Sequence, residues 1–258
     1  MPSCRTRYPI LLIHGLNCRD DWIFPYWGRV ADVLRRHGAR VYLSGQDAWG
    51  SIPGNAGALR RRGEEILTQT GSGKLDLIAH SKGGLEARYL ISTLGFARKT
   101  ASLTTICTPH RGSRAAAEWL ERERICRAAG RAMEGFWRAR GDRDPDFRAA
   151  VSALTPEAME RFNRENPDSP LVYYQSWGAR LDGGGWDPLD RFQLWLTKAD
   201  APTDGLVSPE SAVWGHWRGT LEGVSHQDGA GGRRRRRPGF DAGEFYVRLV
   251  RGLAEMGF

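Results

Sequence analysis

The chain has 258 residues, of which 40% are hydrophobic and ten are tryptophan, so its composition excludes a largely disordered protein. This length can build one α/β domain with a sizeable core and does not require a second domain. The formal net charge is +8, carried mostly by arginine, which can favour nucleic acid or anionic lipid. We expect the basic residues to be spread over the surface.

The start of the chain lacks the long apolar core and the small-residue cleavage site of a secretory signal. No stretch approaches the roughly 18 apolar residues that a membrane-spanning helix needs. We therefore expect a cytoplasmic protein, with secretion left open. The four cysteines lack the spacing of a metal site, and reduced thiols are expected in that compartment.

Short apolar runs alternate with segments of helical periodicity along the chain. The runs predict strands at residues 8–13, 41–43, 75–79, 102–106 and 171–174. The periodic segments predict helices at residues 27–37, 56–70 and 242–256, with a further helix directly after residue 84. Such alternation predicts a mostly parallel central sheet with helices on both faces.

Residues 111–170 break this alternation, because they are highly charged, helix-rich and without a strand signal. We predict a helical cap, or lid, inserted into a single domain that spans residues 1–258. Its apolar residues, among them Trp119, Met133 and Trp137, could also serve only to pack the insertion onto the core.

The most informative stretch is the apolar run 75–79 followed by His80-Ser81-Lys82-Gly83-Gly84 and a helical pattern. A serine on a sharp turn between a strand and a helix is the nucleophile elbow of the α/β-hydrolase fold. Residues two positions either side of the serine must be small, because the strand and helix backbones nearly touch there. Ala79 and Gly83 satisfy this requirement, although alanine replaces the usual first glycine.

An oxyanion hole needs two N–H donors in fixed positions. His14-Gly15-Leu16 follows the first strand, where α/β-hydrolases form part of this hole. We predict the backbone N–H groups of Leu16 and Lys82 as the donors, although His14-Gly15 could equally be a simple turn. The ammonium group of Lys82 is expected to be solvated.

A serine nucleophile also needs a histidine base and an orienting carboxylate, which follow it in the order acid, then histidine. His110 precedes any late acidic loop, and His216, between tryptophans, is expected to be partly buried and structural. His226 stands before the final helix, where this fold carries its base. The candidate acids, in order of preference, are Asp204, Asp187 and Asp200.

Several long motifs resemble the bacterial triacylglycerol lipases related to Pseudomonas and Burkholderia lipases, and most closely their A-H-S-K-G-G branch. The motifs are Y-P-I-L-L-I-H-G-L, A-H-S-K-G-G-L-E-A-R-Y-L, L-T-T-I-C-T-P-H-R-G-S, Y-Y-Q-S-W-G and D-G-L-V, with Q-D-A-W-G-S and a late S-H-x-D. The resemblance implies a triad of Ser81, Asp204 and His226, with Leu16 and Lys82 at the oxyanion hole. It also implies a structural Ca²⁺ site at Asp187 and Asp228. The secreted lipases carry an export signal and commonly a disulfide near these loops, and we expect neither in this chain.

These features together predict a serine ester hydrolase (lipase or carboxylesterase) that needs no cofactor for its chemistry. A thioesterase or acyltransferase with the same triad is the alternative, and an inert lipid-binding protein is a further one. Arg233–Arg237 could contact an anionic membrane, but no interleaved aromatic residues favour nucleic acid. The preferred acyl chain and the oligomeric state stay open.

Overall fold

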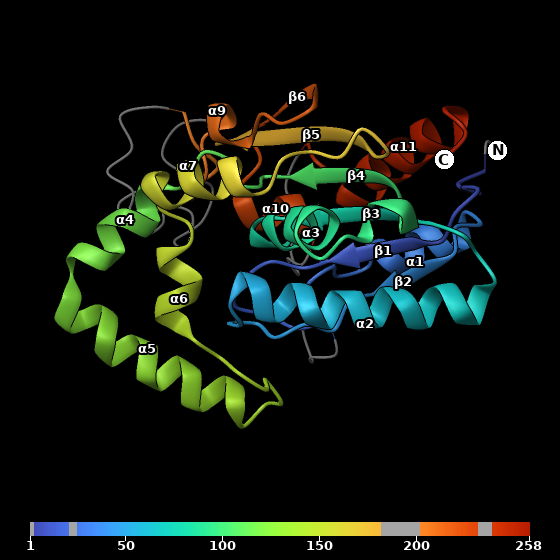
Figure 1. The fold of residues 1–258 in the computed structure, drawn as a ribbon. Helices are drawn as coiled ribbons and strands as arrows, with labels where there is room; N and C mark the ends of the chain where they lie inside the picture. The colour runs from blue at the N-terminus through green and yellow to red at the C-terminus, as the bar shows by residue number, and fades with distance from the viewer. Residues whose placement is uncertain (1–2, 21–24, 182–201, 232–238) are drawn as a thin grey trace.

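The computed structural model describes residues 3–20, 25–181, 202–231 and 239–258 (Figure 1). Within these residues, six parallel strands form one sheet in the order β2-β1-β3-β4-β5-β6. The strands are β1 (Ile10–Ile13), β2 (Val41–Leu43), β3 (Leu75–His80), β4 (Thr100–Ile106), β5 (Tyr173–Arg180) and β6 (His216–Glu222). The prediction of a mostly parallel sheet is therefore confirmed.

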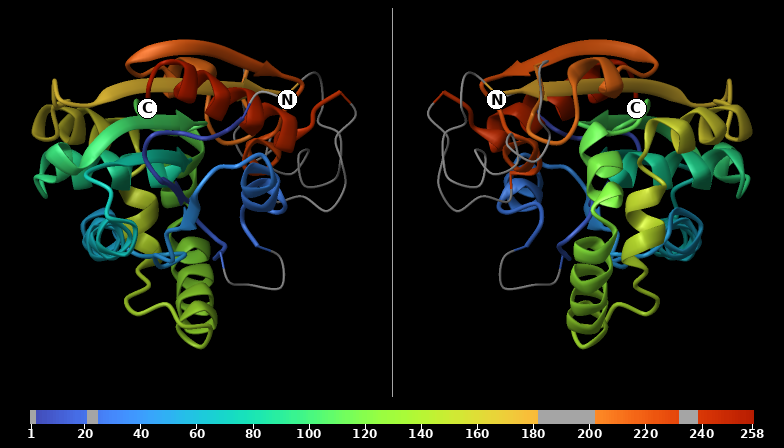
Figure 2. Two further views of the ribbon diagram at one scale, coloured as in Figure 1. Left: turned by 90° about the vertical axis from the view of Figure 1, so that its right-hand side faces the viewer. Right: turned by 90° about the vertical axis from the view of Figure 1, so that its left-hand side faces the viewer.

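Helices cover both faces of the sheet, because successive strand residues point to opposite sides. Ile10 and Leu12 pack in the cluster beneath α1 (Val30–Arg36) and α11 (Ala242–Glu255), whereas Leu11 and Ile13 pack on the other side. That second cluster lies beneath α2 (Ile52–Thr70) and α3 (Lys82–Ser92) (Figure 2). A 3₁₀ turn, η1 (Phe96–Lys99), leads from α3 towards β4.

Most predicted strands and helices are present, but several of their bounds differ: β1 and α1 are shorter than predicted, and β5 lies at Tyr173–Arg180 rather than at residues 171–174. Helix α2 begins at Ile52, earlier than predicted, because Ser51 caps its N-terminus through the N–H of Gly54 and Pro53 occupies its first turn. Strand β6 was not predicted at all. Its residues are exposed or half-buried, so it has no apolar run that could reveal it.

The segment between β4 and β5 is helical, as its composition predicts. It contains α4 (Arg114–Glu121), α5 (Glu123–Arg138), α6 (Phe147–Ser152) and α7 (Pro156–Glu165). Trp137, Phe147 and Phe162 join a third apolar cluster with Trp49, Ile52 and Leu85 of the sheet-flanking layer. Helix α5 extends away from the sheet, and α6 and α7 lead the chain back to β5 (Figure 1).

Among the described residues, no helix combines the length and apolar character of a membrane span. Cys4, Cys18, Cys107 and Cys126, all among the described residues, are not joined by a disulfide.

Candidate active site

Ser81 lies between the last residue of β3 and the first residue of α3, at the carboxyl edge of the sheet. Its backbone has φ +56° and ψ −134°, a conformation that an L-residue adopts only when its surroundings impose it. The N–H of Ser81 donates to the carbonyl of Ile106 (2.9 Å), and the Thr108 hydroxyl donates to its carbonyl (2.8 Å). The neighbouring strand therefore holds the serine in the strained turn of a nucleophile elbow.

The side chains of Ser81, His226 and Asp204 form one hydrogen-bonded row. Nε2 of His226 lies 2.8 Å from Oγ of Ser81, and its Nδ1 lies 2.7 Å from Oδ2 of Asp204. All three residues are buried, with Asp204 fully inaccessible to solvent. This is the arrangement in which a histidine takes the serine proton while a carboxylate orients the ring.

Backbone contacts fix both the acid and the base. Oδ1 of Asp204 accepts from the N–H groups of Leu206 (2.9 Å) and Val207 (2.7 Å), so its other oxygen faces the histidine. The N–H of His226 donates to the carbonyl of Asp204 (2.8 Å). His226 was expected in a loop, but it is the first residue of the short helix α10 (His226–Ala230), which Ser225 caps.

Both segments that carry the predicted oxyanion donors lie next to Ser81. Lys82 begins α3, and the first N–H groups of a helix have no partner within it. The His14-Gly15-Leu16 turn packs directly against the elbow, because a Cβ added to Gly15 would lie 2.7 Å from Cβ of Ser81 and 3.2 Å from its Oγ. A side chain at Gly15 would therefore fill the space beside the nucleophile.

The side chain of Lys82 is not solvated, which corrects the expectation from the sequence. It is 1% exposed, pairs with Glu86 and donates to the carbonyl of Gly50 (2.8 Å). It therefore cannot attract an anionic substrate from solvent. Glu86 was missed, although Lys and Glu four residues apart on a helix are a recognisable pair.

The other histidines have different surroundings. His110 is buried between β4 and Trp214, where burial and the neighbouring Arg88 keep its pKa well below the usual range. His216 stacks on Tyr173 with ring centroids 4.9 Å apart, but it is exposed at the start of β6, so the expectation of partial burial is wrong. Asp187, Asp200 and Arg233–Arg237 lie outside the described residues.

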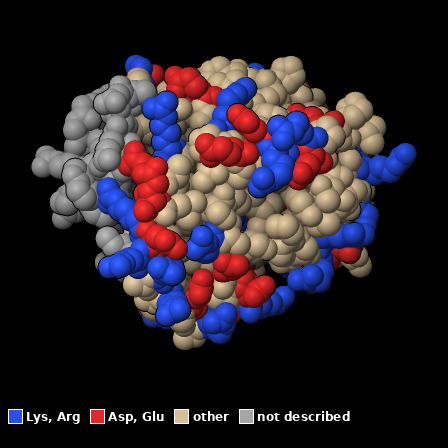
Figure 3. Space-filling model, turned by 60° about the vertical axis from the view of Figure 1, so that its left-hand side comes forward, with Lys and Arg blue, Asp and Glu red and all other residues tan. Residues whose placement is uncertain are grey.

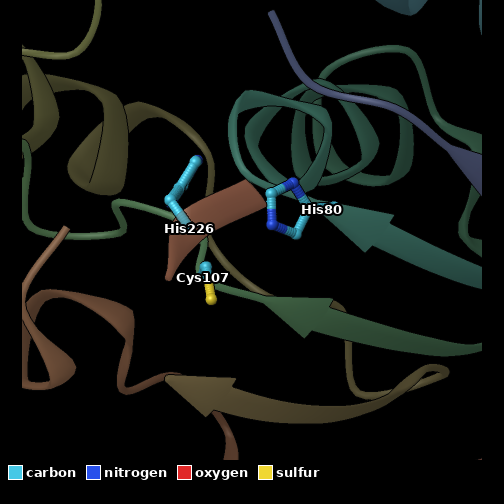
Figure 4. A group of neighbouring side chains, drawn as sticks. All are labelled: His80, Cys107 and His226. Atoms are coloured by element: carbon cyan, nitrogen blue, oxygen red, sulfur yellow. The ribbon is translucent and has the colours of Figure 1, made fainter. Parts of the chain in front are cut away.

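A buried group that the sequence did not reveal borders the base (Figure 4). His80, at the end of β3, packs beside His226 with ring centroids 4.7 Å apart, and its Nδ1 lies 2.7 Å from the Tyr26 hydroxyl. Burial keeps the pKa of His80 well below its usual range and raises that of the Cys107 thiol well above. His80 therefore stays neutral beside the base.

His80, Cys107 and His226 also place potential metal-ligand atoms within 4.8 Å of one another. Both ring nitrogens of His226 already bond, one to Asp204 and one to Ser81. Binding a metal through His226 would break that row, so the group belongs to the hydrogen-bonded site rather than to a separate metal centre.

Asp228, one of the two predicted calcium ligands, is buried near His226. Its Oδ2 accepts from the N–H (3.2 Å) and the hydroxyl (2.7 Å) of Ser225, which completes the capping box of α10. This oxygen thus fixes the helix that carries the histidine. The other predicted ligand, Asp187, lies outside the described residues.

Comparisons with known proteins find lipases by sequence and by fold, while no family model matches the chain. A triacylglycerol lipase of Pseudarthrobacter phenanthrenivorans is 40% identical over 117 residues, which cover 42% of this chain and 35% of that lipase. A triacylglycerol lipase of Vibrio cholerae is 31% identical over 79% of this chain and 73% of its own length. The chain thus spans about a third of the length of the first relatives that it matches, and most of the length of the Vibrio cholerae lipase. The crystal structure of Staphylococcus hyicus lipase superposes with a TM-score of 0.73 at 18% identity, covering 98% of this chain and 96% of that one.

Proposed function

The chain belongs to the triacylglycerol lipase family, and we propose that it is a serine ester hydrolase that works through an acyl-enzyme on Ser81. The observation that carries the proposal is the continuous row from Oγ of Ser81 through His226 to Asp204, built on a strained elbow. A merely structural serine would have no need of this conformation or of these partners.

In the proposed reaction, His226 accepts the hydroxyl proton through Nε2 as Oγ of Ser81 attacks the ester carbonyl carbon. The carbonyl oxygen becomes an oxyanion, which the N–H groups of Leu16 and Lys82 stabilise. His226 then gives its proton to the departing alcohol, leaving the acyl group on the serine. In the second half of the reaction, His226 takes a proton from water, which attacks the acyl carbon. The proton then returns to Oγ of Ser81 as the carboxylic acid is released. Asp204 stabilises the protonated histidine in both halves.

The proposed substrate is an ester with an acyl chain of medium to long length. Leu16, on the turn beside the nucleophile, packs against the apolar cluster of the insertion, where Trp119 and Met133 are only partly buried. An acyl chain leaving the serine on this side would meet apolar surface, which favours longer chains. The insertion of residues 111–170 then acts as a cap. The aromatic-rich loop with Trp22, Phe24 and Trp27 also favours longer chains, but Trp22 and Phe24 lie outside the described residues.

The decisive experiment compares the wild-type protein with Ser81→Ala on p-nitrophenyl esters of increasing acyl length, below and above micelle formation. We expect kcat to fall by at least about 10⁴-fold in the variant, because the nucleophile is lost. A fluorophosphonate should label the wild-type protein and not the variant. Ser92→Ala, at the end of the same helix, is the matched control and should keep full activity and labelling.

A wild-type protein that hydrolyses no ester and resists the fluorophosphonate would contradict the proposal. Higher activity above the micellar threshold would identify a lipase, and activity confined to dissolved esters a carboxylesterase.

A structural Ca²⁺ ion near the histidine loop is a second part of the proposal. Carboxylate oxygens suit this ion, and the buried Asp228 lies two residues from the base. If Ca²⁺ binds only the folded protein, a concentration of 100 times Kd adds about 2.7 kcal/mol of stability. That gain corresponds to an increase in Tm of roughly 5 to 10 °C. Equal Tm values in EDTA and in Ca²⁺ would contradict the site.

The arginine run 233–237 is proposed to adsorb weakly to anionic lipid headgroups, which would bring the enzyme to an ester-bearing surface.

A further inference from the structure

A buried ion pair lies directly behind the nucleophile elbow. The side chains of Lys82 and Glu86, one turn apart on α3, are 1% and 2% exposed, and the ammonium group also donates to the carbonyl of Gly50 (2.8 Å). Burying two charges costs several kcal/mol each, and a buried pair often contributes less stability than apolar residues of similar size. Stability alone is therefore a weak reason for a charged pair at this position.

The Glu86 carboxylate is fully engaged by neutral donors as well. Its Oε1 accepts from the side-chain amide of Asn55 (2.8 Å), and its Oε2 from that of Gln46 (3.2 Å). The same amide nitrogen of Gln46 donates to the carbonyl of His14 (2.9 Å), and Nε2 of His14 lies 3.2 Å from the backbone carbonyl of Gln46. Gln46 thus bridges the Glu86 carboxylate and the backbone of the His14-Gly15-Leu16 turn.

Segment 46–50 makes further contacts to both sides of the elbow. The N–H of Asn17 donates to the carbonyl of Ala48 (3.3 Å), while the carbonyl of Gly50 receives the ammonium group of Lys82. Between the two sides, α3 packs so closely on the turn that a Cβ on Gly83 would overlap the carbonyl oxygens of Ile13 and His14. The turn that carries Leu16 and the helix that starts with Lys82 therefore share one buried polar framework.

We propose that this framework, made of Lys82, Glu86, Gln46 and Asn55, sets the distance between the two N–H donors of the oxyanion hole. The side chains of these residues bond to one another and to backbone carbonyls rather than to Ser81. They are therefore positioning residues for the proposed ester hydrolysis, on which this inference rests. The sequence motif Q-D-A-W-G supplies Gln46 and the carbonyl of Gly50, and Asn55 comes from α2.

The proposal predicts a specific kinetic change in Glu86→Gln, which keeps the shape of the side chain and removes the charge. Oxyanion donors act only at distances of about 2.7–3.1 Å from the developing charge, and an error of about 1 Å can cost 100-fold. We expect kcat to fall about 10- to 100-fold with KM within about twofold, because the ground-state ester makes little use of the hole. Binding of an alkyl trifluoromethyl ketone, whose adduct with serine places an oxyanion in the hole, should weaken by a similar factor.

A double variant separates positioning from stability. Lys82→Met/Glu86→Leu keeps the backbone N–H at position 82 and replaces both buried charges by apolar groups, so Tm should recover relative to Glu86→Gln. Because Gln46 still lacks the carboxylate of residue 86, kcat and inhibitor affinity should stay low. Gln46→Met breaks the bridge while both charges of the ion pair remain, and it should show the same defect. Glu64→Gln, which removes an exposed ion-paired carboxylate on α2, is the matched control and should change neither quantity.

Recovery of kcat together with Tm in the double variant would overturn the inference, since the pair would then be merely structural. Wild-type kcat and inhibitor affinity in Gln46→Met would overturn it as well. If Glu86→Gln does not fold, the double variant and Gln46→Met decide the question. A wild-type protein without esterase activity or fluorophosphonate labelling would instead refute the proposed function, and this inference with it.

Discussion

Asp76 is a carboxylic acid inside the sheet, with no exposed surface and a single short hydrogen bond, from the hydroxyl of Ser102 (2.6 Å). Burial raises its pKa to about 7, although the bond from Ser102 acts in the opposite direction. In the unfolded chain the same group has a pKa of about 3.9. The folded state therefore holds a proton on Asp76 across a pH range in which the unfolded state has released it.

This difference predicts how the free energy of unfolding depends on pH. Because the pKa is raised on folding, the contribution of Asp76 is greatest below about pH 4 and is lost as the pH rises through about 7. Asp76→Asn, which stays neutral, should gain stability relative to the wild type between pH 4 and pH 8, by up to roughly 4 kcal/mol. Urea unfolding of both proteins across this range measures the gain. A difference between them that is constant with pH would show that Asp76 does not titrate there.

Single residues with direct chemical roles were the most predictable from the sequence. Ser81 was assigned from its small neighbours, and His226 from its place before the final helix. Asp204 was the preferred of three acids, and the family resemblance favoured it as well. The structure brings these three together. The role of Gln46 could not be assigned in the same way, because no known order of residue types links a glutamine to His14 and Glu86, and only the fold brings the three into contact.

Arg88 connects the elbow helix to the end of the helical insertion. Its guanidinium donates to Oδ1 of Asn163 (2.7 Å) and the carbonyl of Asn166 (3.1 Å), and it lies 3.6 Å above the ring of Trp214. Burial lowers its pKa to about 10, with Asp168 opposing the shift, so it stays charged at neutral pH. One buried cation thus fastens α3, the end of α7 and the segment before β6.

Removing this cation should destabilise the protein strongly. Arg88→Met leaves the carbonyl and amide acceptors without a donor inside the protein, and breaking a buried charged network costs about 3 to 5 kcal/mol. The measurement is the free energy of unfolding in urea. Arg60→Met, at an exposed ion pair on α2, is the control and should change it by no more than about 0.5 kcal/mol. Equal losses in the two variants would contradict the role of Arg88.

At the level of elements, apolar runs predicted the five buried strands and missed the sixth. Trp177 of β5 faces Gly219 of β6, and half of β6 is exposed, so pairing rather than burial creates this strand. The start of α2 was also missed, because capping by Ser51 extends the helix through a polar, glycine-containing stretch that has little apolar periodicity. Local sequence patterns therefore predict which strands are buried, but they do not predict a strand that forms mainly by pairing with its neighbour.

Across the whole molecule, positive and negative side chains are interspersed on the face shown in Figure 3, so the net charge of +8 is not gathered into one patch there. The proposed contact with anionic lipid therefore does not draw on this face (Figure 3) and rests on the local run Arg233–Arg237 in the sequence. The prediction of a spread surface charge agrees with this face.

Sedimentation with vesicles tests the membrane proposal. Binding should require anionic lipid and weaken at physiological salt, because exposed charges are screened over about 8 Å. Replacing the five arginines by serine should reduce the partition coefficient at least about 10-fold, since each basic residue near the surface contributes about 1 kcal/mol. Neutral vesicles are the control. Binding that ignores both lipid charge and the substitution would exclude this contact.

Strand β6 has a consequence for how the protein behaves at high concentration. It is the outermost of the described strands on its side of the sheet, and an open edge can pair with the same edge of another copy. Several of its features oppose such pairing. Arg218 and Glu222 place charges along the strand, Gly219 has φ +128°, and the register with β5 shifts at Ser176/Trp177. An irregular, charged edge of this kind resists edge-to-edge aggregation without requiring any element to cover it.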